Sequence, residues 1–348
     1  MKKLLITLMC ILLAISMTSC STSVIGSLYQ ASKAKANNSN NTAESNQGGS
    51  IIDEIINIGH EHTFKEEVIN PTCGTKGYTI HTCTECGYYY IDNIKDEIGS
   101  HEYENGVCKK CNQADYPTLI NHISTEIIKA NVTVIVRYYV RSFGMKSLIG
   151  ESSGSGIIFG KFEGTSSSTY YVLSNNHVVY SAEMMSRATY IEYIITDHSG
   201  NSYKANVLAN DSNYDLAVLK FSSNEDNYVV LELDTTNPEK ETNCISLGQP
   251  EGQSNTITLG KVLDYGTVNL SETAASESNV KFDVIKHDAY INNGSSGGAL
   301  IGYDFKIIGI NYAGSKDPKT GNYISSYAIP IEKVIEFLKN NGIIEEQE

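Results

Sequence analysis

A serine, a histidine and an aspartate in three separate segments have the residue types needed for covalent catalysis. Ser296 lies in NNGSSGGAL, His177 in YYVLSNNHVVY and Asp215 in NDSNYDLAVLKF. A serine hydroxyl becomes a good nucleophile when an imidazole takes its proton and a buried carboxylate holds that imidazole in the right tautomer. Taken alone, a histidine beside a strand or an aspartate at a turn is more often structural. Together, in the chain order His, Asp, Ser, the three predict acyl transfer through Ser296.

The glycines around Ser296 bear on whether this segment is a flexible linker or a catalytic loop. Gly294 has the backbone freedom to turn its N–H, along with that of Ser296, toward a developing oxyanion. Gly297 and Gly298 let the chain pass closely behind the serine. We interpret the segment as an oxyanion loop, although small polar residues are also typical of linkers.

The sequence beyond about residue 117 has the character of an all-β domain that positions these three segments. Short runs rich in Val, Ile and Tyr, such as NVTVIVRYYV, YIEYIIT and FKIIGINYAG, are separated by Gly, Asn, Asp and Ser turns. This spacing indicates a β-sandwich or a barrel. Two helices are expected to frame it. PTLINHISTEIIKAN leads in, and PIEKVIEFLKNNG begins at Pro330 and stops at Gly342.

Residues 51–115 contain a second chemical constellation, with five cysteines and four histidines. Two Cys-x2-Cys pairs, Cys83 with Cys86 and Cys108 with Cys111, are separated by 21 residues. Two such pairs have the spacing by which four thiolates surround a tetrahedral zinc. The segment resembles the zinc-ribbon-like modules of some bacterial surface proteins, which implies structural zinc.

Further candidate ligands flank these pairs, namely Cys73, His60, His62 and His101. They allow two ions in place of one: Cys73 and the first pair with one histidine, and His101 with the second pair. Disulfides are the alternative, because oxidised thiols persist outside the cytoplasm. Every candidate ligand fits a closed structural site, so the module is expected to fold around metal and not to catalyse.

The composition is that of an ordinary globular protein preceded by a targeting segment. The hydrophobic content is 41%, and the net charge of −14 argues against a nucleic-acid partner. Residues 1–19 have two lysines and then an apolar run too short to span a bilayer, which predicts a signal peptide. The ending MTSC resembles a bacterial lipobox and implies lipidation of Cys20; an ordinary secretory signal is the alternative. Residues 20–50, rich in Asn and Ser, are predicted to be a tether.

Seven motifs of the β region resemble, in order and spacing, those of the HtrA (DegP-like) branch of trypsin-like serine proteases. They are GSGIIFG, LSNNHVV, DSNYDLAVLK, LGQPEG, NTITLGKV, DAYINNGSSGGAL and YAIP, and they cover residues 125–340 almost continuously. The resemblance implies a double six-stranded β-barrel, with catalysis between the barrels and no catalytic cofactor. By it, His177 matches the general base, Asp215 the orienting acid and Ser296 the nucleophile. Gly294 matches the oxyanion donor.

The same resemblance implies a substrate pocket that takes small or medium aliphatic side chains. Its wall is expected to include Ile310, Asn311 and Tyr312. Tyr290 stands where the family often has a small residue. We expect its ring either to narrow the pocket or to pack outside it.

Three positions near the catalytic segments depart from the family pattern. Ser174 replaces a usual Thr, Asn293 a usual Pro, and Ser295 a common Asn. Loss of the proline leaves the oxyanion loop freer. Because the residue before Ser296 is not Asp, activation by an ion pair with a newly cut N-terminus is not expected, and we expect activation by ordering of the loop.

These observations divide the chain into a lipoprotein signal peptide (1–19), a tether (20–50), a zinc-ribbon-like module (51–115) and a trypsin-like protease domain (116–348), with no PDZ domain expected. The leading interpretation is a membrane-tethered, extracytoplasmic serine endopeptidase that cleaves proteins or peptides. A catalytically silent binding or adhesion protein of the same fold is the alternative, and the filled triad positions favour catalysis. Trimers are common in the resembled family, so an oligomer stays an open expectation.

Overall fold

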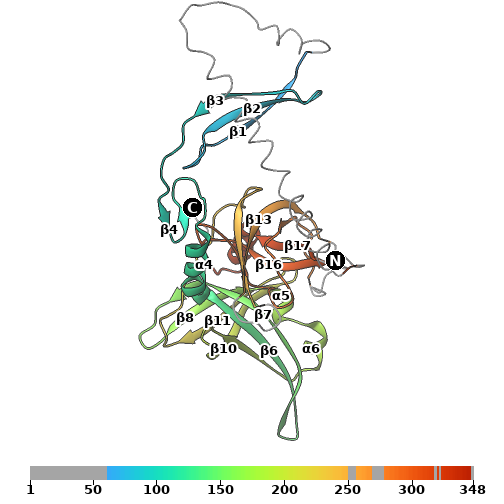
Figure 1. The fold of residues 1–348 in the computed structure, drawn as a ribbon. Coiled ribbons are helices and arrows are strands. Elements are labelled where there is room, and N and C mark those ends of the chain that lie inside the picture. The colour runs from blue at the N-terminus through green and yellow to red at the C-terminus, as the bar shows by residue number, and fades with distance from the viewer. Residues whose placement is uncertain (1–60, 250–255, 269–277, 317–319, 321–322, 346–348) are drawn as a thin grey trace, which may run out of the picture. The chain divides into compact units, whose positions relative to one another are not determined.

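The structure is a computed structural model. It describes residues 61–249, 256–268, 278–316, 320 and 323–345 (Figure 1). The predicted signal peptide, Cys20 and the tether lie outside these residues. In the described part of the chain, no helix has the length and apolar character needed to cross a membrane.

The chain divides into two compact units. The smaller comprises the described residues up to Glu66 together with His81–Tyr90, and the larger comprises Glu67–Ile80 and Ile91–Glu348. Residues 91–115 therefore group with the β-rich region in this division, and the domain boundary at residue 115 stays a prediction. The Cys/His-rich segment forms a three-stranded sheet of β1 (Phe64–Ile69), β2 (Gly77–Cys83) and β3 (Tyr89–Lys95), and a two-stranded sheet of β4 (Tyr103–Glu104) and β5 (Val107–Cys108).

Six strands of the larger unit close into a first barrel. Their side chains alternate between two faces, and closure buries the apolar face inside the barrel and leaves the more polar face outside. In β6, Val132, Val134 and Val136 are fully buried, and the residues between them are partly exposed. In their order around the barrel, the strands are β10 (Ser202–Asp211), β11 (Leu216–Ser223), β8 (Ser168–Ser174), β7 (Met145–Phe162), β6 (Asn131–Ser142) and β9 (Tyr190–Thr196).

A second six-stranded barrel follows in the chain. Its interior contains Val262, Ile285, Leu300 and Ala328, all fully buried. In their order around the barrel, the strands are β12 (Asn243–Gly248), β13 (Thr256–Gly266), β14 (Val284–His287), β17 (Tyr323–Pro330), β16 (Ile307–Lys316) and β15 (Ala299–Gly302). The predicted double six-stranded barrel is confirmed.

Helices at either end of the β region pack into the core that joins the two barrels. α4 (Tyr116–Thr125), with proline in its first turn, leads through the 3-10 helix η1 (Ile127–Ala130) into β6, and α7 (Ile331–Asn340) follows Pro330. After α7, Gly342 adopts φ +62° and the Ile343 N–H donates to the Leu338 carbonyl at 2.9 Å, which ends the helix. One hydrophobic cluster contains side chains of both helices and of both barrels: Leu119, Ile123, Phe337, Leu338, Ile157, Leu173, Ile245 and Leu247. Both predicted helices are confirmed.

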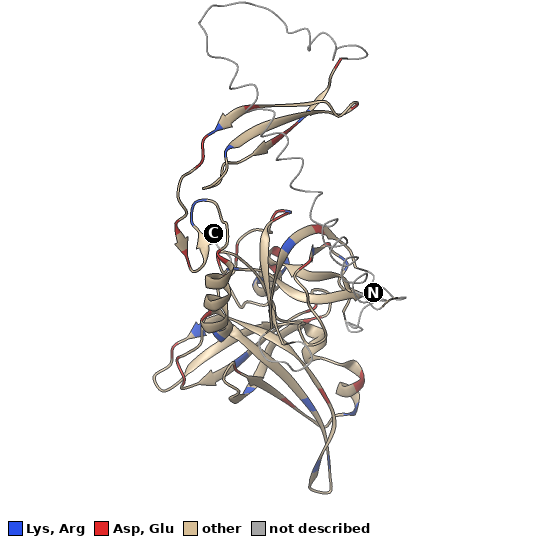
Figure 2. Ribbon diagram, in the orientation of Figure 1, with Lys and Arg blue, Asp and Glu red and all other residues tan. Residues whose placement is uncertain are grey.

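Charged side chains are distributed over the described part of the chain. Lysine and arginine residues are interspersed with aspartate and glutamate along the strands and loops (Figure 2). Many of them form exposed ion pairs, such as Arg137 with Glu151 at 2.7 Å and Lys240 with Asp264 at 2.6 Å. Exposed pairs of this kind contribute little to stability.

Candidate active site

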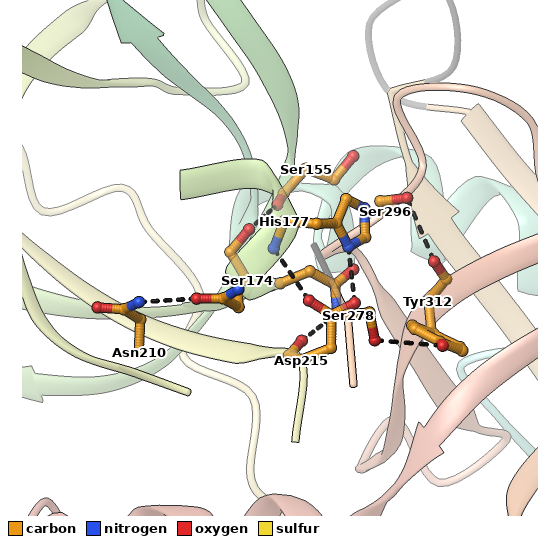
Figure 3. A network of polar contacts seen from close by, with 10 residues as sticks. Ser155, Ser174, His177, Asn210, Asp215, Ser278, Ser296 and Tyr312 are labelled. Carbon is orange, nitrogen blue, oxygen red and sulfur yellow. Dashed lines mark hydrogen bonds and ion pairs between the residues drawn. The ribbon is translucent and has the colours of Figure 1, made fainter. Parts of the chain in front are cut away.

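Adjacent ends of β8 and β11 bring His177 and Asp215 together. α5 (Asn176–Val179), a single turn after β8, carries His177, and Asp215 directly precedes β11. His177 Nδ1 lies 2.6 Å from Asp215 Oδ2, and the His177 backbone N–H donates to Asp215 Oδ1 at 2.9 Å. The carboxylate therefore holds both the ring and the main chain of the histidine (Figure 3). With Nδ1 bonded to the carboxylate, Nε2 is the ring nitrogen left to exchange a proton.

Asp215 is fully buried, and its backbone is fixed as tightly as its side chain. Its φ of +50° is a left-handed conformation that Asp tolerates better than most residues. Asn175 Nδ2 donates to the Asp215 carbonyl at 2.8 Å. A buried carboxylate needs hydrogen-bond donors to offset its lost hydration, and here the ring and amide of His177 both supply them.

Ser296 follows a tight turn that leads into β15. The Ser295 N–H donates to the Asn292 carbonyl at 2.9 Å, and Gly294, the third residue of this turn, has φ +94°. Asn293 is not among the residues with positive φ, so the turn has the pattern of type II, which favours glycine at its third position. Ser296 Oγ lies 3.5 Å from the Tyr312 carbonyl oxygen (Figure 3).

The glycines after Ser296 allow three other strands, β7, β8 and β12, to approach the chain closely. A Cβ on Gly297, whose φ is +86°, would meet the Ser155 carbonyl and the Ser174 hydroxyl. A Cβ on Gly298 would meet the Leu247 carbonyl. The prediction that the chain passes closely behind the serine at these glycines agrees with this packing.

Gly154 on β7 lies against both α5, which carries His177, and the main chain of Ser296. A Cβ at this position would lie 2.6 Å from Val178 Cγ2 and 2.9 Å from the Ser296 carbonyl oxygen. Only a residue without a side chain therefore leaves room for both segments. Because Val178 is the neighbour of His177 in α5, this contact places the serine main chain beside the histidine turn.

Ser155, which the sequence analysis did not single out, connects the first barrel to the turn before Ser296. Its hydroxyl donates to the Gly294 carbonyl at 2.7 Å and accepts from the Gln249 N–H at 2.8 Å. Its own N–H donates to the Ser296 carbonyl at 2.8 Å. The partner Gly294 is 139 positions away, so no local pattern in the sequence marks this role.

The predicted wall of the substrate pocket, Ile310, Asn311 and Tyr312, lies on β16 with its side chains buried, and its part in a pocket stays a prediction. β16 is one of the six strands that close the second barrel, and these residues are at most 1% exposed. Asn311 Nδ2 donates to Ser246 Oγ at 2.9 Å, an interior contact. Burial, and then the nearby charge of Asp215, raise the pKa of Tyr312 to about 12.

Tyr290 lies at the surface, with 41% of its area exposed. Its ring packs edge-on against that of Tyr323, with 5.1 Å between the ring centroids. Its carbonyl accepts from Thr258 Oγ1 at 2.8 Å, which fixes the main chain. A role for the ring in substrate preference stays a prediction.

The structure divides the predicted metal ligands into two groups that differ from the division suggested by the sequence. One group is Cys73, His101, Cys108 and Cys111, and the other is His62, Cys83 and Cys86. Cys73 thus joins the second cysteine pair and not the first. No disulfide joins any two of the described cysteines.

Comparisons with known proteins point to one family. Residues 154–310 match the family described as trypsin-like peptidase domain. Serine protease Do-like HtrA of Bacillus subtilis (strain 168) is 34% identical over 199 residues, or 56% of this chain and 40% of that protein. Periplasmic serine endoprotease DegP of Escherichia coli (strain K12) is 31% identical over 181 residues, which are 52% of this chain and 34% of that protein. A solved serine endoprotease from Yersinia pestis aligns at 24% identity with a TM-score of 0.43, over 63% of this chain and 64% of that chain.

The chain spans less than half the length of these curated relatives. The family match contains His177, Asp215 and Ser296 and runs from β7 to β16. Residues 154–310 are therefore similar to the trypsin-like peptidase domain family, and the curated relatives named here are serine proteases of the HtrA type.

Proposed function

We propose that this protein is an extracytoplasmic serine endopeptidase that cleaves proteins or peptides through an acyl-enzyme on Ser296. The observation that carries the proposal is the buried Asp215 carboxylate, which lies 2.6 Å from His177 Nδ1 in a trypsin-like domain. An imidazole held in this way has Nε2 ready to accept a proton. Ser296 on its glycine turn supplies the hydroxyl.

The reaction begins when Ser296 Oγ turns from the Tyr312 carbonyl, 3.5 Å away, and attacks the scissile carbonyl carbon. His177 Nε2 takes the hydroxyl proton, and Asp215 stabilises the imidazolium without becoming protonated. The carbonyl oxygen becomes an oxyanion, which the N–H groups of Gly294 and Ser296 stabilise. The C–N bond then breaks as His177 gives the proton to the leaving amine, and an ester remains on Ser296.

Water completes the cycle by the same route. His177 accepts a proton from the water as it attacks the ester, and the ester oxygen leaves with that proton to restore the Ser296 hydroxyl. The second product is a carboxylic acid. Serine proteases of this family need no cofactor for catalysis, and each step here uses only side chains and amides of the chain.

The N-terminal sequence and the relatives support a location outside the cytoplasm. In this proposal the segment 1–19 directs export, and lipidation of Cys20 anchors the chain to the cell membrane. A relative in Escherichia coli is named a periplasmic endoprotease, which supports a site of action outside the cytoplasm. The substrates are proteins or peptides.

The Cys/His-rich segment is assigned a structural part in this proposal. Cys73, Cys83, Cys86, His101, Cys108 and Cys111 serve as ligands of structural zinc and take no part in the peptide-bond chemistry. The support is that thiolates and imidazoles at this spacing are the usual ligands of structural zinc.

The proposed activity is tested by incubating the chain without residues 1–19 with unfolded casein and sequencing the products. Wild type is expected to release peptides, Ser296→Ala to release none, and Asp215→Asn to lower kcat by roughly 10⁴-fold, because the histidine loses its tautomer. Ser222→Ala, at an exposed serine of β11, is the matched control that keeps turnover. Bound but uncut casein with the folded wild type, or cleavage by Ser296→Ala, contradicts the proposal.

A further inference from the structure

The group Cys73, His101, Cys108 and Cys111 has the spacing of ligands around one ion. All four ligand atoms lie within 4.8 Å of one another. Cys73 Sγ is 3.7 Å from Cys108 Sγ, and Cys111 Sγ is 3.6 Å from His101 Nδ1. Cys73 and Cys108 are buried, and the other two are partly exposed.

These distances agree with the edges of a tetrahedron around zinc. With Zn–S bonds of about 2.3 Å and Zn–N bonds of about 2.0–2.1 Å, a tetrahedral site has S–S edges of about 3.8 Å and S–N edges of about 3.6 Å. A disulfide would instead bring two sulfurs to about 2.05 Å. The backbone of the second pair also has the tight turn that such a site needs, because the Asn112 N–H donates to the Cys108 carbonyl at 2.9 Å.

The second group, His62, Cys83 and Cys86, lies within the smaller unit. His62 Nδ1 is 3.5 Å from Cys86 Sγ, again close to an S–N edge. A turn closed by the Gly87 N–H and the Cys83 carbonyl at 3.0 Å, with Gly87 at φ +74°, presents the two cysteines on one side. Cys86 is exposed, whereas Cys108 of the first group is fully buried.

We propose that the Cys/His-rich segment binds two zinc ions at separate sites. The closed site is formed by Cys73, His101, Cys108 and Cys111, and the second site by His62, Cys83 and Cys86. Soft thiolates together with imidazoles in tetrahedral spacing select zinc among the common divalent ions. The proposal does not depend on the proposed peptidase activity.

The closed site also orders the chain that leads into the protease barrels. The loop between β4 and Cys111 is hydrogen-bonded to the start of α4. The N–H of Asp115, the residue before this helix, donates to the Gly106 carbonyl at 2.8 Å. A Cβ on Gly106 would meet the backbone of Leu119, which is fully buried in the core that joins the barrels. Metal at Cys108 and Cys111 therefore holds this loop against α4.

Metal analysis of the full chain without residues 1–19 tests the proposal. Zinc measured by mass spectrometry is expected at two ions per chain in wild type, falling to one in Cys108→Ser and to one in the double variant Cys83→Ser, Cys86→Ser. Cys244→Ala, at a buried cysteine outside both groups, is the matched control that keeps two ions. Amide exchange of residues 116–125 is expected to speed up in Cys108→Ser only.

A second measurement, made on wild type, tests the proposal even where a cysteine variant fails to fold. Cobalt(II) titrated into chelator-treated wild type is expected to give the thiolate charge-transfer and tetrahedral bands of two sites, with the intensity falling when either group is substituted. No bound metal, with thiols oxidised in pairs, overturns the proposal in favour of disulfides. A zinc content that the double variant leaves unchanged from wild type overturns the second site, and equal exchange of residues 116–125 in all variants overturns the link to α4.

Discussion

At the residue scale, the hydroxyl of Ser155 holds the turn that carries the proposed oxyanion donor. It donates to the Gly294 carbonyl at 2.7 Å from a fully buried position on β7. The Ser155→Ala variant is expected to lower kcat by about 10- to 100-fold with KM little changed, because the Gly294 amide loses its fixed direction. Steady-state hydrolysis of a peptide substrate measures both constants.

The matched control for this prediction is Ser152→Ala on the same strand. Ser152 Oγ also donates to a carbonyl at 2.7 Å, that of Val178, and makes no contact with the turn before Ser296. Its loss is expected to reduce stability more than it reduces kcat. Equal kinetic effects of the two variants would show that Ser155 acts only through the general packing of β7.

Some residue roles could be read from the sequence, and others depended on contacts made in three dimensions. His177 and Asp215 stood out because their types and chain order suit one chemistry, and the structure brings them together. Ser155 did not, because its partner comes from a distant segment. The part of Ile310 and Tyr312 in a substrate pocket could not be decided from the sequence, because residue type alone does not say whether a strand residue faces the core or the substrate.

At the scale of elements, the turn from Asn292 to Ser295 lacks the proline that its shape favours. Asn293 is the second residue of a type II turn, a position that suits proline because the ring fixes φ near the required value. The Asn293→Pro variant is expected to raise the free energy of unfolding by about 0.4–1 kcal/mol without loss of activity. Urea unfolding and peptide hydrolysis measure the two effects.

Asn292→Pro is the contrasting variant for this turn. The Asn292 N–H donates to Ser295 Oγ at 3.3 Å, and proline removes that donor. This variant is expected to lower both stability and kcat. If Asn293→Pro behaved in the same way, the turn would not be of type II, and the direction assigned to the Gly294 amide would be in error.

Most elements of the β region were predictable, because their signals are local. Short runs rich in Val, Ile and Tyr between turn residues marked the strands, and Pro330 and Gly342 marked the ends of α7. The grouping of Cys73 with the second cysteine pair was not predictable, because loop closure and not spacing decides which thiols meet. The closure of two barrels came from the family resemblance and not from strand pattern alone.

At the scale of the whole molecule, a fully buried histidine couples stability to pH. Burial lowers the pKa of His287 on β14 to about 3, against a smaller opposing effect of a backbone hydrogen bond at Ala289. The folded state therefore binds a proton at His287 less readily than the unfolded chain does. The contribution of the neutral His287 to the free energy of unfolding is fully present above the unfolded pKa of about 6.5 and is lost as pH falls toward 3. Between pH 7.5 and 5.0 the expected loss is about 2 kcal/mol from this residue.

Urea unfolding of wild type and His287→Leu at the two pH values isolates this contribution. Leucine fills a similar volume between Val262 and Ser326, which pair with His287 across the barrel, and it has no proton to bind. The wild type is expected to lose about 2 kcal/mol more than the variant over this range. Parallel losses in the two proteins would place the acid sensitivity in other groups.

The measurement that tests the proposed function most directly is labelling of the folded chain without residues 1–19 by a fluorophosphonate probe, followed by mass spectrometry of the modified peptide. The proposed nucleophile predicts one adduct on Ser296 that is absent from Ser296→Ala and strongly reduced in His177→Ala. An unlabelled wild type of confirmed fold, or an adduct that persists in His177→Ala at the wild-type rate, would contradict an activated serine at this site.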